Sequence, residues 1–465
     1  MPRLLFSSVL PAAPADAFAW HARPGALPRL IAPWSDTEVV HFEGLHDGAT
    51  TVLKVDAGLP YRPAWTSRHE GYVEGETFED RHVDGPFAAW HHVHRFDPDG
   101  AGGTRYVDDI AYALPLAPLS DLVAAPLLAP LGDEFAYRHR TVRDDLAMHA
   151  RYALPPLRIA ISGASGLIGT ALRHVLTTGG HTVLRLVRGA AKGPDEVAWD
   201  VEAGTIDAAR LDGLDAVVHL AGEPVFAPRW TDEKKRRIYA SRIDGTALLA
   251  RTLAALPRPP RVFLAASAIG IYGDRGDEAL PETAAPAASG FLPHVVKDWE
   301  AATRAAENAG IRTVHLRMGI VLSPRGGALA QMLPAFRLGV GGPIGDAGTY
   351  LPWIGLDDTV GAYVHALATE SLSGPVNLAA PEPTTMGVLA DTLARVLHRP
   401  SVLAVPGPLL SALGGEAARE MLLASARVVP ARLMDTGYAF RHGGLETALR
   451  HLLGRPRDGV AFPNV

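Results

Sequence analysis

Residues 159 to 169 read Ile159-Ala160-Ile161-Ser162-Gly163-Ala164-Ser165-Gly166-Leu167-Ile168-Gly169. The three glycines of this stretch, at positions 163, 166 and 169, follow a short apolar strand and lie at the start of a predicted helix. The first glycine permits a tight turn, the second lets the backbone approach a pyrophosphate, and the third lets the helix pack on the strand. The free N–H groups and the dipole of the helix N-terminus favour phosphate groups. We therefore predict a dinucleotide-binding loop with Gly163, Ser165, Gly166, Leu167 and Ile168 as cofactor contacts; the alternative is a glycine-rich turn without a ligand.

The end of the next predicted strand indicates which dinucleotide would bind. An NAD(H) site places Asp or Glu there, where it accepts a hydrogen bond from the ribose 2′-hydroxyl. Here the strand from His181 to Val187 is followed by Arg188, and a cation at this point suits a 2′-phosphate. We predict that NADP(H) is the cofactor and that NAD(H) is the less favoured one. The alternative for Arg188 is a solvated surface arginine.

From Leu157 onward the pattern strand, turn, helix repeats, which predicts parallel strands joined by right-handed helical crossovers. The fold class we expect is α/β, a Rossmann-type doubly wound parallel sheet over residues 157–400. A small helical C-terminal region, 401–465, should complete a substrate lobe. The predicted strands are Leu157–Ser162, Thr182–Val187, Ala216–Leu220, Val262–Ala266 and Thr313–Leu316, and the predicted helices are Leu167–Thr178, Leu409–Leu423 and Leu445–Leu453.

Residues 1–152 have a different texture and predict a separate α+β domain. They hold ten of the nineteen histidines, and their apolar residues often alternate with polar ones, as in antiparallel strands. We expect strands at Thr50–Val55, Phe87–Phe96 and Thr104–Leu114, a helix at Ala15–His21, a long helix from Leu119 to about Met148, and a linker at Tyr152–Pro156.

Composition narrows the classes of function. The chain has 465 residues, a formal net charge of −6 and no cysteine. This excludes disulfides, thiolate metal sites and a cysteine nucleophile, and gives no reason to expect nucleic acid or an anionic membrane as a partner. Pro11 and Pro14 interrupt the short apolar run after Arg3, which argues against a secretory signal. No segment of the sequence approaches the length of uninterrupted apolar residues that a membrane span needs. We therefore expect a cytoplasmic protein.

The order of further motifs makes the region from about 157 to 455 resemble the extended short-chain dehydrogenase/reductase superfamily. Within it, the chain is most similar to the sugar-nucleotide epimerase-like branch often labelled "epimerase family protein". The motifs are the glycine loop, His219-Leu220-Ala221-Gly222-Glu223-Pro224, Ser241-Arg242-Ile243-Asp244-Gly245-Thr246, Ser267-Ala268-Ile269-Gly270-Ile271-Tyr272-Gly273, Asp298-Trp299-Glu300, Arg317-Met318-Gly319-Ile320 and the tail Gly437-Tyr438-Ala439-Phe440.

The resemblance implies further cofactor contacts. Leu220, Ala221 and Gly222 would line the nicotinamide half of the cofactor. Arg242 stands where relatives often have an asparagine beside the cofactor, and Ile320 follows a strand whose end borders the nicotinamide. A packing role is the alternative for each of these residues.

Residues 1–152 resemble, more weakly, the START-like or polyketide-cyclase fold, in which an antiparallel sheet grips a long helix around an apolar cavity. Trp90, His92, His94 and Phe96 would share one face of a strand there. The two histidines are a possible metal pair, but two ligands are too few and no third is evident in the sequence. We therefore predict no metal, and polar contacts or a bound ligand instead.

The resemblance implies a Ser, Tyr and Lys catalytic set that is only partly present. Ser267 matches the serine, but none of the eleven tyrosines has a lysine four residues later. Alignment on Glu300 puts Leu292 and Val296 at the usual Tyr and Lys sites, and Lys297 is one residue off. Tyr272, or His294, could supply the proton instead, and Tyr272 could equally be an ordinary half-buried aromatic residue.

Two function hypotheses follow. The first is an NADP(H)-dependent oxidoreductase or epimerase-like enzyme with Ser267 and Tyr272 as catalytic residues. Its partner would be a small-molecule substrate, for which an apolar compound delivered by the N-terminal domain is one expectation. The second is a non-catalytic NADP(H) sensor coupled to an apolar-ligand domain, which the missing Tyr-x-x-x-Lys pair favours. The substrate and the oligomeric state stay open.

Overall fold

The computed structural model describes residues 1–56, 61–116, 120 and 124–455. Its contacts divide the chain into two compact units. Unit 1 is built mainly from Met1–Leu154, and unit 2 from Pro155–Arg173 and His181–Leu449. The boundary at Leu154 falls inside the predicted linker. The separation of a third, C-terminal domain stays a prediction.

Unit 1 contains a seven-stranded antiparallel sheet with the order β1-β7-β6-β5-β4-β3-β2. The predicted strands in residues 50–55, 87–96 and 104–114 are confirmed as β3, β6 and β7, and burial alternates along β6 as expected for a strand with one covered face. The strands are β1 (Arg3–Leu10), β2 (Glu38–Phe42), β3 (Thr50–Lys54), β4 (Ala64–Val73), β5 (Thr77–Asp84), β6 (Ala89–Pro98) and β7 (Thr104–Ala113).

Helices cover one face of this sheet. Helix α1 (Pro14–Ala22) confirms the predicted helix at Ala15–His21, and the short helix α2 (Ala26–Leu30) follows it. The long helix α3 (Ala124–Tyr152) packs its Phe135 ring against Phe6 of β1, with the ring centroids 4.5 Å apart. The predicted start of this helix at Leu119 lies outside the described residues. A sheet packed on a long helix is the arrangement we predicted, whereas the START-like identity stays a prediction.

Unit 2 is built on an eight-stranded sheet with the order β11-β10-β9-β8-β12-β13-β15-β18, parallel except for the pair β10–β11. Strand β8 lies between β9 and β12, so the strand order reverses on either side of it. In doubly wound sheets this reversal is where ligands bind, beyond the carboxyl ends of the strands. The strands are β8 (Arg158–Ser162), β9 (Thr182–Arg188), β10 (Glu196–Asp200), β11 (Thr205–Ile206), β12 (Ala216–His219), β13 (Val262–Ala268), β15 (Arg312–Met318) and β18 (Gly374–Leu378).

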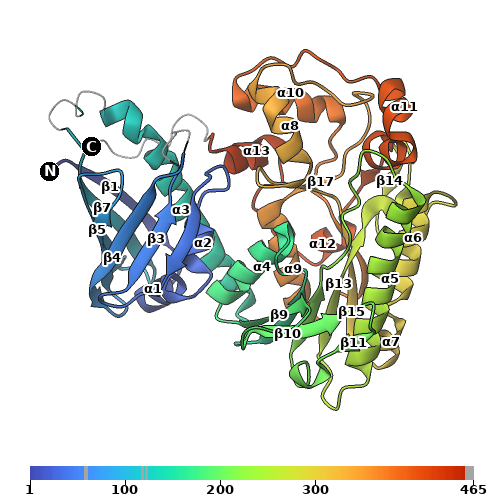
Figure 1. The fold of residues 1–465 in the computed structure, drawn as a ribbon, viewed down its shortest axis with the longest axis horizontal. Helices are drawn as coiled ribbons and strands as arrows, with labels where there is room; N and C mark the ends of the chain where they lie inside the picture. The colour runs from blue at the N-terminus through green and yellow to red at the C-terminus, as the bar shows by residue number, and fades with distance from the viewer. Residues whose placement is uncertain (57–60, 117–119, 121–123, 456–465) are drawn as a thin grey trace. The chain divides into compact units, whose positions relative to one another are not determined.

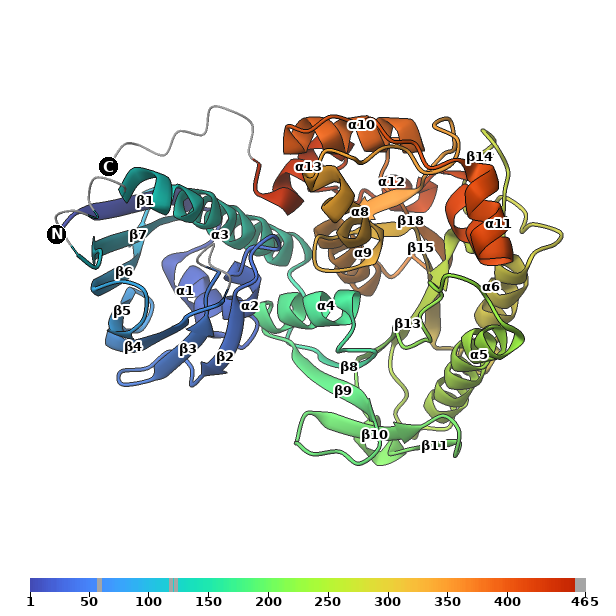
Figure 2. The same ribbon diagram turned by 45° about the horizontal axis from the view of Figure 1, so that its top comes forward.

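Helices lie on both sides of the sheet in unit 2. Figure 1 shows α5, α6 and α7 on one side, and α4 and α9 on the other. Figure 2 shows the same division for α5 and α6 against α4 and α9. Both faces are therefore covered, and the central strands are apolar and buried, as expected for a parallel sheet. The helices are α4 (Leu167–Thr178), α5 (Asp232–Ala254), α6 (Phe291–Ala301), α7 (Arg304–Asn308) and α9 (Leu356–Ala368).

The later part of unit 2 adds a second, smaller set of elements. The predicted helix Leu409–Leu423 is wrong in one respect, because Gly415 adopts φ 59° and breaks the helix inside α11 (Gly407–Ala418). The predicted helix Leu445–Leu453 is confirmed as α13. No helix among the described residues has the length and apolarity needed to cross a membrane. The remaining elements are β14 (Ala279–Leu280), β16 (Ile320–Leu322), β17 (Trp353–Gly355), β19 (Arg427–Val428), α8 (Gly327–Arg337), α10 (Met386–Leu397) and α12 (Ala431–Asp435).

Candidate functional site

The glycine loop joins β8 to α4 at the point where the strand order reverses. Gly163 has φ +68°, and a Cβ there would lie 2.8 Å from the backbone nitrogen of Ala221. A Cβ on Gly169 would lie 2.2 Å from the carbonyl oxygen of Gly163. A Cβ on Gly166 would meet only that same oxygen, at 3.3 Å. The protein's own packing therefore requires the first and third glycines, whereas Gly166 leaves one side of the loop open.

A buried hydrogen-bonded pair ties the ends of β8 and β12 together. The Ser162 hydroxyl oxygen accepts the backbone N–H groups of Leu220 and Ala221 at 3.1 and 3.2 Å, so its own proton is donated to His219 Nδ1 at 2.6 Å. Burial, helped by the charge of Arg242, lowers the pKa of His219 to about 4. The ring is therefore neutral and holds its proton on Nε2. This pair positions Leu220 and Ala221 beside the glycine loop.

Sequence reasoning assigned no role to His219. The only available signal was a histidine at the end of an otherwise apolar strand, next to Leu220, because the strand Ala216–His219 is buried throughout. A buried polar side chain needs a hydrogen-bond partner, but the sequence does not show which residue supplies it.

Arg242 of α5 lies against the segment that follows β12, and its predicted place beside the cofactor stays a prediction. Its Nη1 donates to the carbonyl oxygen of Glu223 at 2.9 Å, and its Cζ lies 5.0 Å from the centroid of the Trp299 ring. A Cβ on Gly222 would lie 3.5 Å from the same Cζ. Burial lowers the pKa of Arg242 to about 10, so the side chain stays charged at neutral pH. The guanidinium is thus fixed beside Gly222 by protein groups.

The predicted phosphate contacts are accessible to a ligand. Ser165 and Gly166 are exposed, and Leu167 and Ile168 are half-buried at the start of α4. Arg188 ends β9, the parallel neighbour of β8, and is exposed. Its side chain makes no hydrogen bond or ion pair with any residue that the structure describes. The loop and this free cation therefore lie at the same edge of the sheet.

Ile320 lies beyond that edge but outside the main sheet. It follows the end of β15 by two residues and begins β16, which pairs with β17. The side chain is half-buried. Both a cofactor contact and a packing role remain compatible with this position.

Ser267 is placed at the carboxyl end of β13 but is fully buried. Its hydroxyl donates to Glu300 Oε1 of α6 at 2.6 Å. The same carboxylate accepts two hydrogen bonds from Arg317 of β15, at 2.8 and 2.9 Å. Burial opposes ionisation of Glu300, but the hydrogen bonds and charge of Arg317 outweigh it and lower its pKa below the usual value. In this arrangement Ser267 is one end of a buried ion-pair network.

Tyr272 belongs to the same network. Its ring is 0% exposed; its hydroxyl donates to Asn377 Oδ1 at 2.8 Å and accepts from Arg317 Nη1 at 2.9 Å. Burial raises the pKa of its phenol, although Arg317 and Asn377 oppose this. The phenol is therefore protonated and engaged with protein groups. We call Ser267, Tyr272, Glu300, Arg317 and Asn377 the buried polar network.

Helix α6 carries apolar residues at the two positions of the usual Tyr and Lys pair. Leu292, at the position where the resemblance places Tyr in relatives, is half-buried, and Val296, at the position of Lys, is buried. Lys297 is exposed, one residue further along and about 100° round the helix. His294 is exposed and lies 3.4 Å from Asp298, so it faces away from the buried polar network.

Comparisons with known proteins agree with this geometry. Residues 159–379 match the model of the NAD dependent epimerase/dehydratase family, and residues 405–452 match a domain of unknown function. Epimerase family protein Mb2239 of Mycobacterium bovis is 40% identical over 298 residues, which are 64% of this chain and 98% of that protein. The chain belongs to the epimerase family.

Two solved structures of this epimerase family extend the comparison. A nucleoside-diphosphate sugar epimerase from Corynebacterium glutamicum is 34% identical with a TM-score of 0.78, over 97% of this chain and 90% of its own. That similarity therefore includes both units. Human epimerase family protein SDR39U1, solved with NADPH, is 34% identical with a TM-score of 0.60, over 64% of this chain and 99% of its own.

Proposed function

We propose that this epimerase family member is an NADP(H)-dependent enzyme of oxidoreductase or epimerase type that acts on a small molecule. The observation that carries the proposal is the open glycine loop at the switch point, with Arg188 at the end of the neighbouring strand, where its side chain has no partner among the described residues. The loop offers backbone N–H groups to a pyrophosphate, and the guanidinium offers a bidentate partner to a 2′-phosphate. When bound, the cofactor would supply the hydride chemistry.

Two relatives support this choice of cofactor and reaction class. The human relative was solved with NADPH, and the relative from Corynebacterium glutamicum is described as a nucleoside-diphosphate sugar epimerase. An apolar substrate, or one shared by the two units, stays an expectation. Nothing in the comparisons supports the sensor alternative.

Ser267 and Tyr272 remain our proposed catalytic residues, with a condition that the structure adds. Both hydroxyls are hydrogen-bonded to protein groups, so a catalytic role requires one of these bonds to be exchanged for a bond to the substrate. Ser267 donates to Glu300 and keeps an oxygen lone pair that could accept from a substrate hydroxyl. Glu300 and Arg317 would act as positioning residues by holding Ser267 at the end of β13.

The cofactor proposal is tested by titrating NADPH and NADH into the wild type and Arg188→Ala. A charge-assisted hydrogen bond contributes about 1.5–3 kcal/mol, so we expect NADPH affinity to fall about 10- to 100-fold and NADH affinity to stay unchanged. Arg261→Ala is the matched control, because Arg261 is exposed just before β13, at the opposite edge of the sheet. If Arg188→Ala lowers the affinity for NADPH and NADH equally, or lowers neither, Arg188 does not select the phosphorylated cofactor.

Turnover is tested by a screen of carbonyl compounds and sugar nucleotides with NADPH, in the wild type and in Ser267→Ala. Under the proposal, at least one substrate class is converted and the variant loses most of the rate with its cofactor affinity intact. Cofactor binding without any conversion would instead favour the non-catalytic sensor.

A further inference from the structure

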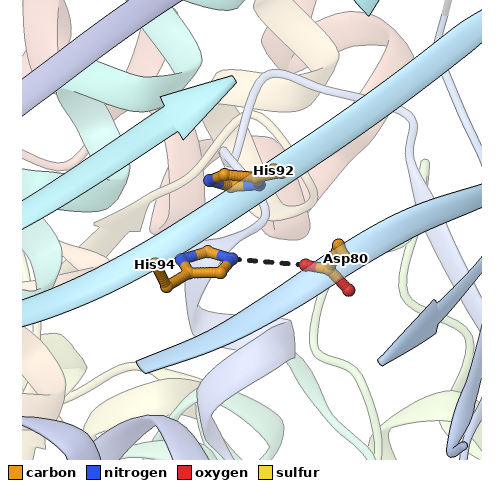
Figure 3. A group of neighbouring side chains, drawn as sticks. All are labelled: Asp80, His92 and His94. Atoms are coloured by element: carbon orange, nitrogen blue, oxygen red, sulfur yellow. Dashed lines mark hydrogen bonds and ion pairs between the residues drawn. The ribbon is translucent and has the colours of Figure 1, made fainter. Parts of the chain in front are cut away.

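The inner face of the unit 1 sheet carries a buried cluster of histidine and aspartate side chains. Asp80 lies on β5, His92 and His94 on β6, and Asp108 on β7, which are three adjacent strands. The register places Asp80 opposite His92, and His94 opposite Asp108. All four side chains therefore project from the same face of the sheet. Figure 3 shows the two imidazole rings beside each other and the Asp80 carboxylate directed at His94.

Three of these side chains have the spacing of a metal-binding set. One ligand atom each from Asp80, His92 and His94 lies within 4.8 Å of the other two. The Asp80 Oδ2 to His94 Nε2 distance is 3.2 Å. Two ligands at zinc bonding distance are about 3.3 Å apart in a tetrahedral site. The Asp80–His94 pair already meets this spacing, and a ligand atom of His92 lies within 4.8 Å of both partners.

Asp108 occupies the position of a carboxylate that orients metal-bound histidines. Its Oδ1 lies 2.7 Å from His94 Nδ1 and 3.1 Å from His92 Nε2, and its Oδ2 lies 3.0 Å from His139 Nε2. Metal-bound histidines commonly donate their second ring N–H to such a carboxylate. Within the described residues, the contacts of Asp108 Oδ1 with the two rings are not aligned as hydrogen bonds.

Because the cluster is largely removed from water, the negative charge of its carboxylates must be compensated by neighbouring groups. The Asp108 side chain is 0% exposed and His92 4%, whereas Asp80 is 20% exposed and leaves a route from solvent. Positive charge stabilises the buried carboxylate of Asp108 and the partly exposed carboxylate of Asp80, and His69 Nδ1 already lies 2.9 Å from Asp80 Oδ1. A divalent ion with neutral imidazoles supplies positive charge at one point. Two nitrogens and one oxygen, with no cysteine in the chain, form a donor set that suits zinc or a similar transition metal.

We propose that Asp80, His92 and His94 bind one divalent transition-metal ion of the zinc class in unit 1, with Asp108 as the orienting carboxylate. Three protein ligands leave one coordination position for water or for an oxygen of a small ligand. The sequence shows the two histidines, and the fold brings Asp80 to them as the third ligand. This site is independent of the cofactor site in unit 2.

The test is zinc titration of the chelator-treated full-length protein, monitored by competition with a chromophoric chelator. We expect one equivalent of tightly bound zinc in the wild type. His94→Gln and Asp80→Asn should each weaken binding by more than about 100-fold, and Asp108→Asn by about 10- to 100-fold. His91→Gln is the matched control: His91 is on the same strand but faces the other way, 2.5 Å from Glu79. It should bind zinc like the wild type.

A second measurement keeps the proposal testable if a variant fails to fold. The wild type loaded with cobalt should show the intense visible absorption of a four-coordinate site. For the wild type loaded with zinc, X-ray absorption at the zinc edge should report two imidazole ligands and one carboxylate oxygen. Absence of stoichiometric binding in the wild type would overturn the proposal. So would a zinc affinity equal to that of the wild type in folded His94→Gln and Asp80→Asn. Either result would make the cluster a metal-free hydrogen-bonded network.

Discussion

The glycine loop and the buried polar network lie at the same edge of the unit 2 sheet, but they are built in opposite ways. The loop is made of backbone, is open on the side of Gly166, and follows β8, whose parallel neighbour β9 ends at the exposed Arg188. The network is made of side chains from β13, β15, β18 and α6 and of Tyr272, which follows the end of β13 by four residues; Ser267 and Tyr272 are fully buried. The loop therefore leaves the side of Gly166 accessible to a ligand, whereas the polar groups of the network form hydrogen bonds with one another. Substitutions on the open side of the loop should therefore lower ligand affinity, whereas substitutions in the network should lower the free energy of unfolding.

The largest effect on stability should come from breaking the network at its ion pair. Glu300→Ala leaves the buried Arg317 guanidinium without its carboxylate, and breaking such a pair costs about 3–5 kcal/mol. Urea unfolding followed by circular dichroism would measure this loss. Glu278→Ala is the control, because its ion pair with Arg275 is half-exposed and should contribute less than about 1 kcal/mol. Equal losses in the two variants would contradict the distinction between the network and an ordinary surface pair.

The second-largest effect on stability should come from Gly169, the glycine at which helix α4 packs against the loop. In Gly169→Ala the new methyl group would lie 2.2 Å from the Gly163 carbonyl oxygen, and backbone atoms cannot move aside cheaply. We expect a loss of about 3 kcal/mol in the free energy of unfolding, at the upper end of the usual cost of overpacking. Thermal unfolding without cofactor measures it. A melting temperature equal to that of the wild type would show that helix α4 does not approach the loop this closely.

The pair of Ser162 and His219 predicts a pH dependence of intermediate size. The folded state lowers the pKa of His219 from 6.5 to about 4, so the unfolded chain takes up the proton first as the pH falls. Stability from this group is complete above pH 6.5 and is lost progressively toward pH 4. Between pH 7.5 and 5 the loss should be about 2 kcal/mol. His219→Gln should lack this part of the acid sensitivity, measured as the difference between the urea midpoints at the two pH values. An unchanged pH dependence would mean that His219 is not held neutral.

The contrast between loop and network also explains what the sequence can predict. The loop, the parallel sheet and the strands of unit 1 are predictable because glycine spacing and apolar periodicity are local properties. The position of Arg188 at the end of β9 is predictable for the same reason, whereas its role toward a cofactor stays a prediction. The break at Gly415 inside a predicted helix is not, because apolar spacing does not report a left-handed backbone angle.

Side-chain partners across elements are the part that the sequence does not contain. Ser267 is found by resemblance, but its partner Glu300 comes from a helix 33 residues later and Arg317 from the next strand. Asp80 reaches His94 only through the register of β5 and β6. Each such pair depends on where separate elements dock, which no local pattern reports. A charged residue inside an apolar strand, such as Arg317, signals only that some partner must exist.

The most direct test of the account is an NADPH titration of the wild type and Gly166→Ala, with the thermal stability of both measured in parallel. Gly166 faces the open side of the loop, so a methyl group there should obstruct a pyrophosphate but disturb only one backbone contact at 3.3 Å. The account predicts binding near micromolar Kd for the wild type. For the variant it predicts a loss on the order of 100-fold, with stability within about 1 kcal/mol. NADPH binding of equal strength in both proteins would contradict it.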